Sequence, residues 1–108
     1  MREITVAALQ LSLGSNDEAE NIAAVSELVE QAAARGSQLI LPPELFSGPY
    51  FCKTEDEARF ALARPTQEHP SVIAMRKLAA KLKVAIPTSF FERDGQHYYN
   101  TMAMVDAR

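Results

Sequence analysis

The chain has 108 residues, of which 47% are hydrophobic and 23% charged, and its formal net charge is −3 at pH 7. This composition suits one globular domain or part of one, and it offers no basic surface for nucleic acid or an anionic membrane. Its apolar runs are too short to cross a bilayer, its start does not resemble a signal peptide, and its lone cysteine, Cys52, excludes an intrachain disulfide framework. We therefore expect a cytoplasmic protein.

The first half of the chain is predicted to form a strand, a helix and a second strand. Residues 4–11 are mostly apolar with early β-branched side chains, which predicts a central strand buried on both faces. Ser15 and Glu18 form a capping box, and an apolar stripe extends the predicted helix to about Arg35. Residues 38–41 form the next apolar run, so the order predicts a right-handed parallel crossover.

The second half is predicted to form two helices and a hairpin. Residues 55–62 suit a short helix, and Pro70 suits the first turn of another helix over residues 71–82. A third strand follows over residues 84–91, and Asp94 and Gly95 indicate a hairpin that returns through residues 97–105. Together these elements predict an α/β layered fold with a mixed sheet.

Two histidines and two methionines receive structural interpretations. His69 precedes the proline that starts a helix and His97 lies next to the hairpin turn, and neither has a partner at metal-ligand spacing. We therefore expect no metal site. Met102 and Met104 alternate with small and apolar residues on the last strand, which favours a place in the core.

Glu44 is the candidate functional residue. It follows an apolar strand and two prolines, which cannot continue the hydrogen-bond ladder of that strand. Glu44 should therefore lie at the carboxyl end of the strand, the edge where open α/β sheets bind ligands. Nearby apolar and aromatic residues would partly desolvate a carboxylate there, which suits a general base. The alternative is a solvated loop residue or a cap for a neighbouring helix.

The order of the elements and the residues at their edges resemble the nitrilase, or carbon–nitrogen hydrolase, superfamily. The resemblance covers nearly the whole chain but only the first third of such a domain. It depends on four stretches of sequence: residues 6–10, residues 21–22, residues 39–46 and residues 99–103. Within the superfamily, residues 44–52 and 89–101 are most similar to the subfamily that hydrolyses N-carbamoylputrescine.

The resemblance implies the N-terminal part of an α-β-β-α sandwich, with residues 1–108 as an incomplete portion of a single domain. It implies hydrolysis of a non-peptide C–N bond by a Glu, a Lys and a Cys, with Glu44 as general base and proton shuttle. No metal or organic cofactor is implied. The expected partners are a small amide or carbamoyl-amine substrate and, in the full-length protein, further copies of the same chain.

The sequence departs from this pattern in its remaining catalytic residues. The Lys and Cys of the family lie in segments that would follow Arg108, and Cys52 stands where the family has no nucleophile. Lys53, Lys77, Lys81 and Lys83 do not match the lysine motif either, so the 108 residues alone should be inactive. Two alternatives remain open: a sister activity, such as that of a β-ureidopropionase or an ω-amidase, and a non-catalytic truncated α/β module.

Three further residues are candidates for supporting roles. Tyr50 and Phe51 would offer aromatic faces to a cationic substrate tail, although Phe51 could equally fill the core under the loop. Asn100 could support the Glu44 loop by hydrogen bonding, or it could be an ordinary residue at a strand edge. Cys52 is interpreted as a buried, apolar-like side chain.

Overall fold

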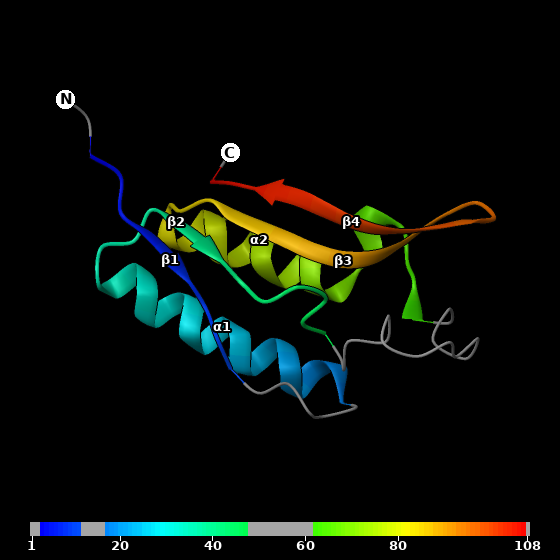
Figure 1. The fold of residues 1–108 in the computed structure, drawn as a ribbon, viewed down its shortest axis with the longest axis horizontal. Helices are drawn as coiled ribbons and strands as arrows, with labels where there is room; N and C mark the ends of the chain where they lie inside the picture. Colours follow the sequence, from blue (N-terminus) through cyan, green and yellow to red (C-terminus); the bar gives the residue numbers. More distant parts are fainter. Residues whose placement is uncertain (1–2, 12–16, 48–61, 108) are drawn as a thin grey trace.

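The computed structural model describes residues 3–11, 17–47 and 62–107. In these ranges β1 (Val6–Ala8), α1 (Glu18–Ala34) and β2 (Leu39–Leu41) are followed by the 3₁₀ helix η3 (Thr66–Glu68). Helix α2 (Pro70–Leu82) and the strands β3 (Ile86–Asp94) and β4 (His97–Val105) complete the order (Figure 1). The predicted short helix over residues 55–62 lies outside the described residues except for Leu62.

The described strands form two pairs, β1 with β2 and β3 with β4, which an isolated bridge joins into a mixed arrangement. β1 pairs with β2 in parallel, with Val6 opposite Leu39, and β3 pairs with β4 in antiparallel register. A parallel bridge between Leu39 and Ala85 joins the two pairs, and the Ile40 N–H donates to the Ala85 carbonyl at 3.0 Å. The strands therefore follow one another in the order β1, β2, β3, β4, which confirms the predicted α/β class and the mixed sheet.

The two long helices form where the apolar periodicity predicts them. Helix α1 begins one residue after Asp17, whose carboxylate accepts from the Glu20 N–H at 3.1 Å. The cap is thus Asp17 rather than the predicted Ser15, because an aspartate nearer the apolar stripe can satisfy the first free amides. At α2, Pro70 stands in the first turn as predicted, and His69 is the N-cap.

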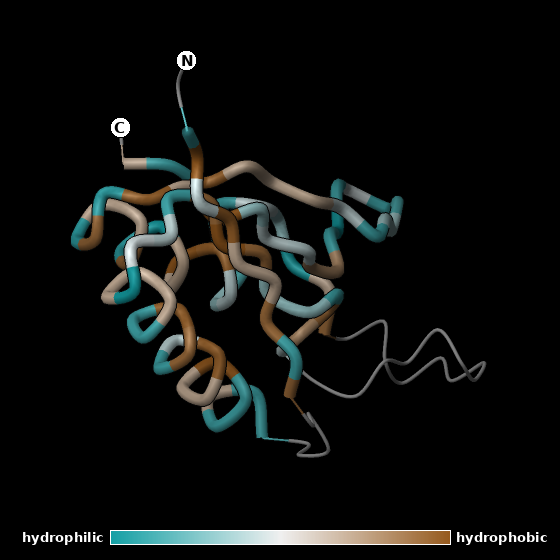
Figure 2. The backbone as a smooth tube through the Cα atoms, turned by 60° about the vertical axis from the view of Figure 1, so that its left-hand side comes forward, coloured by the Kyte–Doolittle hydropathy of each residue, from teal (hydrophilic) through white to brown (hydrophobic). Residues whose placement is uncertain are grey.

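The larger of two core clusters among the described residues lies between the helices and one face of the sheet. Both helices and the inward residues of the strands contribute to it, which means that α1 and α2 cover the same face (Figure 2). Its fully buried members come from both helices, from two strands and from the turn after β2. They are Val25 and Val29 of α1, Met75 and Ala79 of α2, Ile40 of β2, Ile86 of β3, and Phe46 of the turn.

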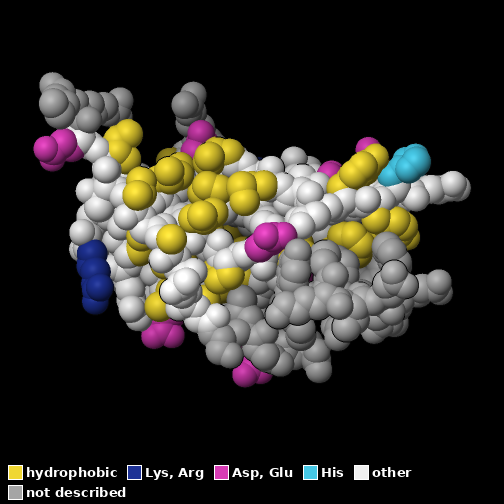
Figure 3. Space-filling view, viewed as in Figure 1, with side chains coloured by type: hydrophobic (Ala, Val, Ile, Leu, Met, Phe, Trp, Pro, Cys, Tyr) yellow, Lys and Arg dark blue, Asp and Glu magenta, His cyan; other side chains and the backbone are white. Residues whose placement is uncertain are grey.

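The opposite face of the sheet carries exposed apolar side chains, which corrects two predictions. β1 is short and open to solvent, with Val6 62% exposed, instead of a strand over residues 4–11 that is buried on both faces. Met102 and Met104 are 58% and 64% exposed instead of lying in the core. The reason is that the described helices cover only one face, while alternate strand residues point to the other. Figure 3 shows hydrophobic side chains gathered over the strands on this outer face.

The hairpin between β3 and β4 turns one residue later than its strongest signal. Asp94 pairs with His97, so Gly95 and Gln96 occupy the two central positions of the turn. Gly95 has a φ of 63°, a backbone conformation that glycine adopts without steric cost. The register that follows places Asn100 on the outer face, two residues from Met102.

Candidate active site

Glu44 lies where the sequence places it, just after the carboxyl end of β2. The strand ends at Leu41, and the two prolines lead into the turn that contains Glu44. The predicted partial desolvation is wrong for the described structure, because the Glu44 side chain is exposed. It belongs to the outer side of the sheet, which the two helices do not cover, so solvent reaches the carboxylate, as the solvated-loop alternative supposes.

Asn100 holds the Glu44 carboxylate across the sheet. Its Nδ2 donates a hydrogen bond to Glu44 Oε1 at 2.8 Å, although the two residues are 56 positions apart in sequence. This is the contact on which the predicted supporting role of Asn100 depends. Whether either residue takes part in a reaction stays a prediction.

Ser89 connects Asn100 back to the turn. The Leu45 N–H donates to Ser89 Oγ at 3.2 Å, and Ser89 Oγ donates to Asn100 Oδ1 at 3.4 Å. The hydrogen bonds therefore run from the backbone beside Glu44, through Ser89 and Asn100, to the carboxylate of Glu44 itself. Ser89 is only 5% exposed, so this connection lies against the protein interior.

The backbone after Glu44 is anchored by buried side chains. Leu45 has a φ of 49°, an uncommon conformation for a residue with a branched side chain, and it packs with Ala63 and Phe91. Phe46 is fully buried in the main core. Such a conformation persists only where the surroundings enforce it. The two anchors therefore fix the direction in which the Glu44 side chain leaves the chain.

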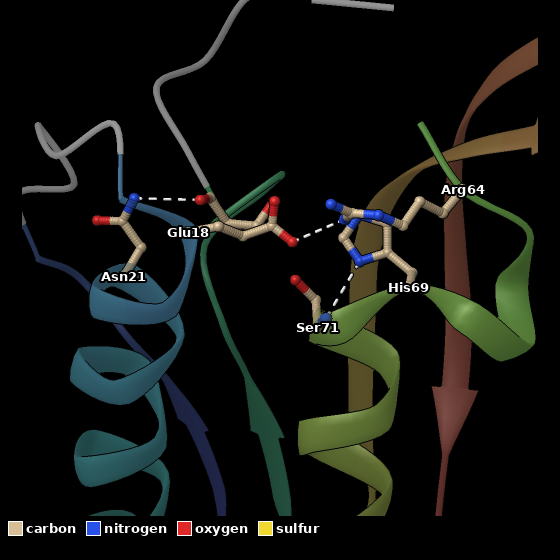
Figure 4. Close-up of polar contacts among 6 residues, drawn as sticks. Glu18, Asn21, Arg64, His69 and Ser71 are labelled. Carbon is tan, nitrogen blue, oxygen red and sulfur yellow. Dashed lines mark hydrogen bonds and ion pairs between the residues drawn. The ribbon is translucent and has the colours of Figure 1, made fainter. Parts of the chain in front are cut away.

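A side chain of α1 holds the other end of the same turn. Asn21 is 3% exposed, and its Nδ2 donates to the main-chain carbonyl of Ser47 at 3.1 Å (Figure 4). This contact explains why a polar residue occupies the buried stripe of α1. The turn that carries Glu44 is thus tied to α1 at Ser47 and to β3 and β4 through Ser89 and Asn100.

A second polar cluster joins the start of α1 to the start of α2 (Figure 4). Arg64 donates to Glu18 Oε1 at 2.7 Å, and His69 Nδ1 accepts from the Ser71 N–H at 3.1 Å. The His69 ring lies 5.3 Å from that of Phe90. Burial lowers the pKa of His69 to about 4, with Glu18 raising it and Arg64 lowering it by smaller amounts. This neutral histidine caps a helix, as its sequence position predicted.

The other candidates contribute no described group to this site. Tyr50, Phe51 and Cys52 lie outside the described residues, so their predicted places stay untested. On α2, Lys81 pairs with Glu30 of α1 at 3.1 Å, in the helical layer rather than on the outer face.

In the part of the chain that the structure describes, no three His, Cys, Asp or Glu residues are grouped to hold a metal ion. Nor is any described helix long and apolar enough to cross a membrane.

Comparison with known proteins identifies the family. Residues 5–108 match the carbon–nitrogen hydrolase family. The chain belongs to this family. It is 44% identical over 106 residues to an N-carbamoylputrescine amidase of Arabidopsis thaliana, covering 98% of this chain and 35% of that protein. It is 47% identical over 107 residues to a citrullinase of Francisella tularensis, covering 99% of this chain and 37% of that protein.

The fold agrees with a solved structure of the same family. The carbon–nitrogen hydrolase of Helicobacter pylori G27 superposes with a TM-score of 0.83 at 24% identity, over 96% of this chain and 36% of that one. This likeness concerns the fold. Our chain thus spans about a third of the length of the carbon–nitrogen hydrolases that it matches.

Sequence reasoning missed Ser89 and the structural use of Asn21. Both are polar residues at positions that the apolar pattern assigns to the interior, and each bonds to the turn after β2. A buried polar side chain must find a hydrogen-bond partner, so this break in the pattern was the available signal. The partner itself lies 26 or 44 residues away and has no local signature.

Proposed function

We propose that these residues form the Glu-bearing part of an enzyme that hydrolyses N-carbamoylputrescine to putrescine, ammonia and carbon dioxide. The observation that carries the proposal is the fixed carboxylate of Glu44 at the carboxyl end of β2, held by Asn100 at 2.8 Å in a chain of the carbon–nitrogen hydrolase family. The lysine and the cysteine of the reaction would lie outside the 108 residues.

In this proposal Glu44 moves protons and the cysteine forms the covalent bond. Glu44 accepts the thiol proton as sulfur attacks the carbamoyl carbon, and it returns that proton to the departing nitrogen. It then takes a proton from water as water attacks the thioester-type intermediate. The lysine would stabilise the oxyanion of each tetrahedral intermediate. The Glu44 carboxylate is exposed on the outer face, so groups from outside the 108 residues can reach it.

A second candidate substrate has a specific observation in its favour. The similarity to a citrullinase is as high as that to the N-carbamoylputrescine amidase. Citrulline and N-carbamoylputrescine both carry a carbamoyl group on a primary amine, but citrulline adds an α-carboxylate and an α-amine. The two substrates therefore use the same attack on the carbamoyl carbon and differ in what surrounds the tail.

A comparison of three substrates tests the proposal. Ammonia release by the purified full-length protein would be measured with N-carbamoylputrescine, citrulline and N-carbamoyl-β-alanine. We expect the highest kcat/KM for N-carbamoylputrescine. A preference for citrulline would favour the second candidate, and a preference for the anionic carbamoyl-β-alanine would refute both in favour of a β-ureidopropionase-like activity.

The proposal also covers the binding partners of the protein and its location in the cell. The substrate is a small molecule, the full-length protein associates with copies of itself, and neither nucleic acid nor membrane is a partner. Light scattering would measure the association, and cell fractionation would check the cytoplasmic location. An intact mass near 11.9 kDa for the natural product, with folded monomers and no ammonia release, would favour the non-catalytic module instead.

A further inference from the structure

We propose that Ser89 is a positioning residue for the reaction, because it sets the orientation of the Asn100 amide and, through it, of the Glu44 carboxylate. This inference rests on the proposed role of Glu44 as general base. Ser89 would touch neither substrate nor nucleophile. It acts through hydrogen bonds that begin and end at the same turn.

The direction of each hydrogen bond follows from the chemistry of the groups. A backbone N–H can only donate, so Ser89 Oγ must accept from Leu45, at 3.2 Å. The single hydroxyl proton of Ser89 is then free to point at Asn100 Oδ1, which accepts it at 3.4 Å. With its carbonyl oxygen occupied in this way, Asn100 turns its NH₂ group toward Glu44 Oε1, at 2.8 Å.

The opposite orientation of the Asn100 amide would place its carbonyl oxygen against the carboxylate, and two acceptors would then face each other. The carboxylate oxygens of Glu44 disfavour this arrangement because they accept hydrogen bonds, and Ser89 stabilises the observed orientation by donating its proton to Asn100 Oδ1. Connected hydrogen bonds also polarise one another, so each strengthens the next in a protected environment. Ser89 and Leu45 are 5% and 4% exposed, which provides that protection at the start of the chain of bonds.

The positive φ of Leu45 gives Ser89 a second effect on Glu44. The Leu45 backbone, at 49°, holds an uncommon conformation immediately after Glu44, and its amide is satisfied by Ser89. Loss of the hydroxyl would leave a buried N–H without its acceptor and would favour relaxation of the turn. Glu44 would then lose its fixed backbone as well as its oriented partner.

The neighbouring residue on the same strand provides a matched control. Thr88 is fully buried on the other face of β3, and its hydroxyl donates to the Ile86 carbonyl at 3.1 Å, not to the Glu44 turn. Thr88→Val and Ser89→Ala each remove one buried hydroxyl from β3. Only the second should affect Glu44.

The experiment measures amide exchange and steady-state kinetics in the full-length protein. In Ser89→Ala we expect faster hydrogen–deuterium exchange at the Leu45 amide and a kcat for N-carbamoylputrescine reduced by about 10-fold or more, with KM changed by less than about 2-fold. Ser89→Thr, which keeps the hydroxyl, should restore most of kcat, and Thr88→Val should retain wild-type values of both quantities.

A second variant tests the orientation of the amide without touching Ser89. Asn100→Asp keeps an acceptor for the serine but replaces the NH₂ donor with a carboxylate oxygen beside Glu44. A neighbouring negative charge favours the protonated form of a carboxyl group, so the acidic limb of the kcat/KM profile should move to higher pH. A purely structural role for Asn100 would lower activity without moving this limb.

Three results would overturn the inference. They are unchanged exchange and kcat in Ser89→Ala, equal losses in Thr88→Val, and an unmoved acidic limb in Asn100→Asp. If the wild-type protein releases no ammonia from any carbamoyl substrate, the proposed function fails. The exchange comparison between Ser89→Ala and Thr88→Val then still decides whether Ser89 holds the turn.

Discussion

The buried His69 should make the protein less stable in acid by an amount that can be worked out from its surroundings. In the unfolded chain a histidine titrates with a pKa of 6.5, whereas burial lowers the pKa of His69 in the folded protein to about 4. The unfolded state therefore binds an extra proton between these values. Stability from this residue is complete above about pH 7, falls as the pH drops from 6.5 to about 4, and changes no further below that.

The expected loss is about 3 kcal/mol, since each pH unit of difference between the two states corresponds to about 1.4 kcal/mol. The variant His69→Asn isolates this effect. An asparagine can still cap α2 by accepting from the Ser71 N–H, but it does not titrate. It also loses the ring contact with Phe90, which should lower its stability at every pH.

Urea unfolding followed by far-UV circular dichroism at pH values from 7 to 4 measures the difference directly. The stability advantage of the wild type over His69→Asn should shrink by about 3 kcal/mol across this range. His97→Asn is the matched control, because His97 is exposed and its replacement leaves His69 in place. A constant difference between wild type and His69→Asn would refute the reasoning.

Three further substitutions test the packing around the site by urea unfolding. Phe46→Ala removes a fully buried ring and should lower the free energy of unfolding by about 3–5 kcal/mol. Met102→Ala, on the exposed face, should change it by less than about 0.5 kcal/mol. Similar losses for the two variants would contradict the assigned core. Asn21→Ala should cost about 1–3 kcal/mol because the Ser47 carbonyl loses its buried donor, and a neutral result would argue against that contact. Gly95→Ala should cost about 1 kcal/mol from its φ of 63° alone, since an added Cβ meets no atom within 4 Å; a much larger loss would contradict the hairpin geometry.

Local sequence patterns predicted the parts of the fold that depend on interactions between residues close together in the sequence. The apolar stripe of α1, the proline at the start of α2 and the glycine of the hairpin each act within a few residues. The first two appear as expected, and Gly95 lies in a turn that comes one residue later than predicted. The position of Glu44 was also predictable, because Pro42 and Pro43 cannot extend the ladder of β2.

The sequence could not predict which face of the sheet would be covered. β1 and the end of β4 are apolar at consecutive positions, which suggests burial on both faces, but such burial requires a layer on each face. In the described residues both helices lie on one side, so Val6, Met102 and Met104 remain exposed. The same geometry leaves Glu44 open to solvent.

The polar contacts of the site also depend on distant pairings. Asn100 meets Glu44 only because the register of β3 and β4 brings it to the outer face beside the turn after β2. Ser89 reaches Leu45 for the same reason, 44 residues away in sequence. A polar residue in an apolar strand signals that a partner exists, but the partner is known only once the strands are aligned.

Glu44 is the residue that we propose as the general base of a carbon–nitrogen hydrolase. Ammonia release from N-carbamoylputrescine by the full-length wild type, by Glu44→Gln and by Glu27→Gln, an exposed residue of α1, tests it most directly. We expect Glu44→Gln to lower kcat by about 10²–10⁴-fold and Glu27→Gln to match the wild type. Full activity of the Glu44→Gln protein would contradict the claim.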